Sequence, residues 1–84
     1  MNLLKVIVRS RQGLVFEGEL LAVTSINSVG RFDILPNHTN FVTTIVKKVI
    51  LTKPDGQKQE INISNGVILV ERNEVKVFLG VSKV

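Results

Sequence analysis

Residues 54–79 read PDGQKQEINISNGVILVERNEVKVFL, and this stretch decides the fold class. It opens on Pro54-Asp55-Gly56, three residue types that favour tight turns. Polar and apolar residues then alternate over 57–63, and such alternation is typical of a half-buried strand. The stretch therefore begins as a turn that leads into a strand.

Two further turn signals follow in the same stretch. Ser64-Asn65-Gly66 predicts that the chain turns there, and Arg72-Asn73 predicts a hairpin between strands at 67–71 and 74–79. Turns that recur every 8–12 residues or so are typical of an antiparallel sandwich or barrel. The C-terminal half therefore predicts an all-β fold.

The N-terminal third continues this pattern. Residues 4–9 alternate and predict a half-buried strand, which ends in a turn at 11–13. The stretch 14–26 predicts a long strand, with Gly18 as a bulge or bend. A loop at 27–30 is expected to close it.

A short strand over 31–35 is expected next, because Pro36 cannot donate to a ladder hydrogen bond. The segment 40–51 is ambiguous. Its apolar residues recur at helical spacing, with Asn40 as a candidate N-cap, but its many β-branched residues favour a strand. The residues alone favour the strand and leave the helix open.

The composition supports strands. Val, Ile and Thr make up about a third of the chain, and there is a single alanine. With 84 residues the chain is expected to form one domain, residues 1–84, with a small core. Hydrophobic residues are 44% of it, so we expect an apolar patch to stay exposed and to mark a partner interface.

The sequence offers little for catalysis. One histidine and no cysteine cannot build a zinc site or supply a reactive thiol, and no glycine-rich phosphate loop is present. Glu17 and Glu19 share one strand face, but a solvated outer face explains them better than an acid–base pair. His38 is expected to form hydrogen bonds in a loop. We therefore predict no catalytic residue, no cofactor and no metal.

The net charge of +4 keeps a nucleic-acid-binding alternative open, as a small basic β-barrel. Single-strand binders stack bases on exposed aromatic rings. The chain has no Trp or Tyr and only four Phe, which we interpret as core or interface residues. We therefore favour a protein partner over a nucleic acid. No stretch is long and apolar enough for a membrane helix, so direct membrane insertion is not expected.

The segment 30–38, GRFDILPNH, resembles the signature of the epsilon subunit of F-type rotary ATP synthases, in which a glycine precedes Ile-Leu-Pro-x-His. The context agrees: VFEGE at 15–19 with AVT at 22–24 resembles the family's second strand, and NGVILV at 65–70 resembles its later hairpin. The resemblance spans about residues 3–80.

The resemblance implies an antiparallel β-sandwich of about eight to ten short strands, like the N-terminal domain of the ATP synthase delta/epsilon family, and it implies a strand for 40–51. In the family this domain belongs to a non-catalytic accessory subunit. It binds the gamma subunit of the central stalk and the membrane rotor ring, and so couples proton- or sodium-driven rotation to ATP synthesis.

The resemblance also assigns contact residues by position. The face toward gamma corresponds to His38, Asn40, Phe41 and Thr43, and the rotor-ring contact corresponds to Ser28, Val29, Gly30, Arg31 and Phe32. The implied location is the cytoplasmic face of the cell membrane, or an organelle inner membrane, held there through the complex.

The chain departs from the family in three ways. The family continues into a C-terminal helical hairpin, which is expected to be absent here because the sequence stops at Val84. Lys47-Lys48 stands where the family has a Pro-Gly turn. Asp33 replaces a common glycine, and Arg31 stands where an acidic or neutral residue is usual, which changes the charge offered to the rotor ring.

Overall fold

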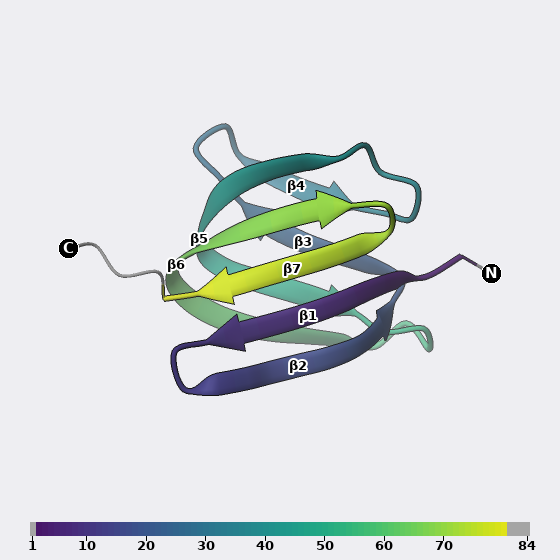
Figure 1. Cartoon of the computed structure of the whole chain (residues 1–84), viewed down its shortest axis with the longest axis horizontal. Helices are drawn as coiled ribbons and strands as arrows, with labels where there is room; N and C mark the ends of the chain where they lie inside the picture. The colour runs from purple at the N-terminus through teal and green to yellow at the C-terminus, as the bar shows by residue number, and fades with distance from the viewer. Residues whose placement is uncertain (1, 81–84) are drawn as a thin grey trace.

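The strands follow the alternation of apolar and polar residues. In the first one, Leu4, Val6 and Val8 are buried while Lys5 and Arg9 are exposed. The computed structural model describes residues 2–80 and contains seven strands in that range (Figure 1). They are β1 (Leu4–Ser10), β2 (Gly13–Leu20), β3 (Ala22–Ile26), β4 (Arg31–Ile34), β5 (Phe41–Thr52), β6 (Lys58–Glu71) and β7 (Glu74–Leu79).

The seven strands form one continuous sheet in the order β2-β1-β7-β6-β5-β3-β4. Neighbours are antiparallel except β1 and β7, which are parallel. The sheet folds over on itself because β5 and β6 are long and belong to both layers. The later half of β6 pairs with β7, whereas the later half of β5 pairs with β3. In Figure 1, β1, β2 and β7 lie in the front layer, and β3 and β4 lie behind.

The two long strands bend where their register shifts. Val46 pairs with Asn65 but Lys47 pairs with Ile63, so Ser64 has no partner across the ladder. Lys47 has a φ of 74°, a conformation that is uncommon for a residue with a side chain. Such a bulge bends the strand and increases its twist. This bend turns one sheet into a two-layered sandwich.

The core lies between the two layers and is built from hydrophobic side chains that every one of the described strands contributes. Its fully buried members are Leu4, Val6, Val8, Leu20, Val23, Ile34, Ile45, Val49, Leu51, Ile68, Val70, Val75 and Val77. Two buried polar residues lie beside it and are paired: Ser25 Oγ donates to the Lys48 carbonyl at 2.8 Å, and Thr24 Oγ1 donates to Asp33. Both buried hydroxyls are therefore satisfied.

The predicted all-β sandwich is confirmed, and the helix considered for 40–51 is wrong, since β5 is one strand. Within 2–80 there are seven strands rather than eight to ten. The count is lower because the turn predicted at 64–66 does not form, and because the strand also continues through Lys47-Lys48, where the family has a Pro-Gly turn. Both places lie at the bulge inside a continuous strand.

Two further details differ in the first half of the chain. Gly18 pairs regularly with Val6, and the β1–β2 register shift skips Val15 instead, so the bulge predicted at Gly18 is wrong. The predicted strand over 14–26 is interrupted at Leu21, which separates β2 from β3. The outer limits of the predicted domain, residue 1 and residues 81–84, lie outside the described range. From 2 to 80, no helix is long and apolar enough to cross a membrane.

Candidate partner-binding surfaces

The loop at 35–40 contains His38 and Asn40, which the sequence predicts as contact residues. It has no Asp, Glu, Lys or Arg. The His38 ring lies 4.9 Å from the Phe41 ring, centre to centre, and its Nδ1 donates to the Thr39 carbonyl at 2.7 Å. Leu35 exposes 55% of its surface in the same loop. His38 is thus held by its own loop, as expected from the sequence, and neither Asp33 nor Glu17 hydrogen-bonds to it in the described part of the chain.

The same loop is tied to the β6–β7 hairpin. The Asn37 N–H donates to Asn73 Oδ1, and the Arg72 N–H donates to Asn40 Oδ1 at 3.1 Å. The Asn73 carbonyl in turn accepts the Lys5 N–H at 2.8 Å. Side-chain amides therefore fix the 35–40 loop against the hairpin, and a backbone hydrogen bond joins the hairpin to β1.

The loop at 27–30 is closed by its own asparagine. Asn27 Oδ1 accepts the N–H groups of Val29 at 2.9 Å and of Gly30 at 3.2 Å, as in an Asx turn. Gly30 has a φ of 142°, which requires the freedom of a glycine. The turn presents Val29 at its tip, with 93% of its surface exposed. Such an exposed apolar tip is suited to insertion into a partner.

The two predicted contact groups lie next to each other. The rings of Phe32 in β4 and Phe41 in β5 meet edge to face, with centres 5.9 Å apart and planes at 78°. Asn27 Nδ2 also donates to Thr43 Oγ1 at 3.3 Å. β4 and the first part of β5 thus approach each other across one side of the sandwich. Phe32 and Phe41 are only half-exposed there, since both pack against the core.

A second surface was not assigned residue by residue from the sequence. We call it the outer apolar face, and it consists of Val42, Val46, Val67, Leu69 and Phe78 on the outside of β5, β6 and β7. Cross-strand pairing joins its members, Val42 with Leu69 and Val67 with Phe78. The sequence does indicate this face, because residues 67–70 are apolar at every position. Successive side chains of a strand point to opposite sides, so every second one of these must point outward.

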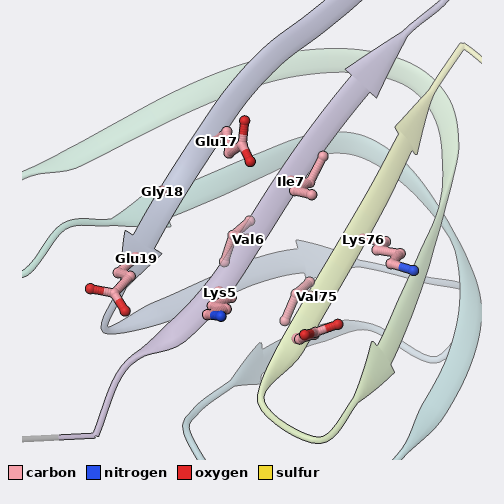
Figure 2. A pocket seen from close by; sticks show the side chains of 9 residues that line it. Lys5, Val6, Ile7, Glu17, Gly18, Glu19, Val75 and Lys76 are labelled. Atoms are coloured by element: carbon pink, nitrogen blue, oxygen red, sulfur yellow. The ribbon is translucent and has the colours of Figure 1, made fainter.

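A hollow of about 460 Å³ lies on the outside of β2, β1 and β7 (Figure 2). Cross-strand pairing places Lys5 between Glu19 and Glu74, and Ile7 between Glu17 and Lys76. In the described residues the only salt bridge is elsewhere, between Lys48 and Glu60 at 3.8 Å. Exposed charges of mixed sign are typical of a solvated sheet face, as the sequence predicts for Glu17 and Glu19.

Comparison with known proteins identifies the family. Residues 3–80 match the family described as ATP synthase, Delta/Epsilon chain, beta-sandwich domain. The ATP synthase epsilon chain of Clostridium botulinum (strain Eklund 17B / Type B) is 34% identical over 77 residues, covering 90% of this chain and 56% of the relative. The epsilon chain of a Nitratiruptor species is 33% identical over 75 residues, covering 88% and 58%. The chain thus spans less than two thirds of these relatives.

Solved structures support the same fold. A chain of the Euglena gracilis mitochondrial ATP synthase, OSCP/F1/c-ring, superposes with a TM-score of 0.87 at 16% identity, over 94% of this chain and 51% of that one. A chain from the central stalk/c-ring of the Tetrahymena thermophila enzyme gives 0.74 at 11% identity, over 90% and 62%. At such identities the likeness shows the fold alone. Together with the match over residues 3–80, it establishes that this chain belongs to the ATP synthase delta/epsilon family and forms its β-sandwich domain.

Proposed function

We propose that the chain is the β-sandwich of a non-catalytic central-stalk subunit of an F-type ATP synthase. In this role it binds the gamma subunit and the membrane rotor ring, and couples proton- or sodium-driven rotation to ATP synthesis at the membrane that holds the complex. The observation that carries the proposal is the outer apolar face, which adjoins a side of the sandwich formed by the predicted contact residues. An apolar surface of this kind favours a protein partner.

We assign gamma to the outer apolar face and to the neighbouring residues His38, Asn40, Phe41 and Thr43. We assign the rotor ring to the 27–30 loop with Arg31 and Phe32. This division follows the resemblance to the family. The shapes of the two surfaces agree with two different contacts, since the face spreads over three strands and the loop presents a single apolar tip at Val29. A joint that transmits torque must not slip, so we expect both contacts together to bury at least about 1,600 Å².

Gel filtration with purified gamma tests the proposal. The folded chain is expected to co-elute with gamma, and the complex is expected to survive a rise in salt because apolar contacts are insensitive to screening. A chain that retains its β-sheet circular dichroism but elutes separately from gamma at micromolar concentrations would contradict the proposal.

The nucleic-acid alternative finds no specific support in the described residues. Phe16, Phe32 and Phe41 are half-buried against the core, and Phe78 exposes 41% of its surface within the outer apolar face. Base stacking needs several free rings along a basic groove. Binding of a single-stranded oligonucleotide that weakens steeply with salt, as counterion release requires, would revive this alternative.

A further inference from the structure

Four strand segments in the sandwich pair on one side only. They are β2, β4, the first half of β6 (58–63) and the first part of β5 (41–45). A free edge presents unpaired N–H and C=O groups to any strand that approaches, so proteins usually protect it with charged residues. The four edges of this chain can be compared on that basis.

Three of the edges are protected and one is not. Each protected edge carries two charged residues, which are Glu17 and Glu19 in β2, Arg31 and Asp33 in β4, and Lys58 and Glu60 in 58–63. By contrast, 41–45 reads FVTTI and has no charged side chain, no proline and no glycine. In Figure 1 this part of β5 forms the upper border of the front layer, with β4 behind it. The edge is therefore open to strand pairing.

The register determines which backbone groups of this edge are free. Arg72 and Asn73 have φ values of 50° and 64°, and they join Glu71 to Glu74 as a two-residue turn with both central residues left-handed. Such a turn makes Glu71 and Glu74 a hydrogen-bonded pair. Counting back from Glu71 in steps of two, residues 71, 69 and 67 of β6 point their N–H and C=O groups toward β7. The remaining residues of β6, at 66, 68 and 70, point theirs toward β5.

The partners of those three residues are Ile45, Thr43 and Phe41. These residues of β5 therefore bond to β6, and Val42 and Thr44 direct their N–H and C=O groups to the open edge. The Thr44 carbonyl accepts the Thr43 hydroxyl at 3.2 Å and keeps a second lone pair for a partner. Two residues after Thr44, Val46 directs its backbone groups to the same side, and there it pairs with Ile26 of β3. Beyond that pair β3 ends, and the edge is left without a neighbouring strand among the described residues.

We propose that an extended strand of a partner protein pairs with this edge and hydrogen-bonds to the backbone of Val42 and Thr44. The inference rests on the proposed function, which makes the partner the gamma subunit. The side chains of Val42 and Thr44 point to the same side as the outer apolar face, so one partner covers the edge and the face together. An added strand would extend the front layer without a break.

A second copy of the chain fits this edge less well. Two copies that pair edge to edge meet over about five residues each, far less than the roughly 1,200 Å² of a stable interface. Such a dimer also leaves the outer apolar face in water. We therefore take gamma, the partner of the proposed function, as the occupant of both surfaces.

Amide hydrogen exchange of the full chain, measured by NMR with and without purified gamma, tests the pairing directly. In the free chain the amides of Val42 and Thr44 are expected to exchange rapidly, while those of Thr43 and Ile45 are protected by β6. With gamma bound, Val42 and Thr44 are expected to slow by at least about tenfold. Unchanged exchange at both residues in a saturated complex overturns the proposal.

A matched pair of variants adds a functional measurement. Thr44→Pro removes only an outward N–H, which an edge strand tolerates, whereas Thr44→Ala keeps it. We expect T44P to weaken gamma binding by about tenfold relative to T44A, the effect of one lost hydrogen bond, with similar thermal midpoints.

The outcomes separate the two proposals. If the wild-type chain does not bind gamma, the proposed function fails and the strand pairing fails with it. If the wild type binds and T44P, still folded, binds as tightly as T44A, only the strand pairing is overturned. A dimer of the chain alone that T44P abolishes also overturns it, because a second copy then occupies the edge.

Discussion

Asn37 and Asn73 are 36 residues apart in the chain, yet the backbone N–H of Asn37 donates to Asn73 Oδ1 and Asn73 Nδ2 lies 3.4 Å from Asn37 Oδ1. Both residues have left-handed backbones, with φ values of 69° and 64°. Asparagine tolerates this conformation better than most residues. The pair therefore shapes two turns and also joins them.

Replacing Asn73 separates these two roles. Asn73→Gly keeps a residue that accepts positive φ but removes the side chain that holds the 35–40 loop. We expect a loss of about 1 kcal/mol in the free energy of unfolding, measured by urea denaturation, because the two exposed hydrogen bonds between the Asn73 side chain and Asn37 are lost. Asn73→Asp is the control: its carboxylate still accepts the Asn37 N–H, so it is expected to lose less. Equal stability of N73G and the wild type would show that the asparagine pair contributes nothing.

The contact between Phe32 and Phe41 closes one side of the sandwich and can be measured as a coupling energy. We expect the variants Phe32→Leu and Phe41→Leu to be non-additive, with a coupling of about 0.5–1.5 kcal/mol for an edge-to-face pair. The four proteins of the double-mutant cycle are compared by urea denaturation. Additive losses would mean that the two rings pack independently.

Gly66 lies where the neighbouring strands β5 and β7 leave no room for a side chain. A Cβ at this position would come within 2.6 Å of the Phe78 carbonyl oxygen, which is backbone and cannot easily move. We expect Gly66→Ala to lose about 2 kcal/mol or more, which corresponds to roughly 8 °C or more in thermal midpoint.

Gly18→Ala is the matched control for Gly66→Ala. Its Cβ would meet the end of the Phe16 ring at 3.2 Å, and that ring is only half-buried and can move. We expect it to lose clearly less than G66A. Similar losses in the two variants would show that the close approach to Phe78 is not what limits residue 66.

The outer apolar face is expected to matter for binding more than for folding. The double variant Val42→Ser, Leu69→Ser keeps every backbone hydrogen bond but makes the centre of the face polar. We expect gamma binding to weaken by about tenfold or more, as for the centre of an interface. Ile50→Ser, on the outside of the back layer, is the control and is expected to bind gamma normally in the same titration. Unchanged binding by the double variant would remove this face from the interface.

The sequence predicted the fold class and most strand ends, because these depend on local alternation and on turn residues. Residues 4–9, 31–35 and 74–79 were placed within one residue of the strands observed. Local pattern failed at 64–66, where Ser-Asn-Gly resembles a turn but β6 continues. The neighbouring strand β5 pairs with β6 both before and after Ser64, and this pairing outweighs the local preference of Ser-Asn-Gly for a turn.

For the binding surfaces, the resemblance assigned contact residues but could not show how they lie. The contact between Phe32 and Phe41 depends on how β4 faces β5 across the sandwich, and no sequence spacing determines it. The free edge at 41–45 depends on where β3 stops beside β5, which again follows from the bend. Both features become visible only when the register is known.

The bend itself provides a last test, since Lys47 has a φ of 74° and Lys48 is not among the residues with positive φ. A left-handed backbone costs a residue with a side chain roughly 1 kcal/mol more than glycine. Lys47→Gly is therefore expected to stabilise the chain by up to about 1 kcal/mol in urea denaturation, whereas Lys48→Gly, in ordinary strand conformation, is expected to destabilise it by about 0.5–1 kcal/mol. If both variants lose stability to the same extent, the bulge at Lys47 does not hold the backbone strain assigned to it, and the bend must be maintained by the pairing of β5 with β6 and β3.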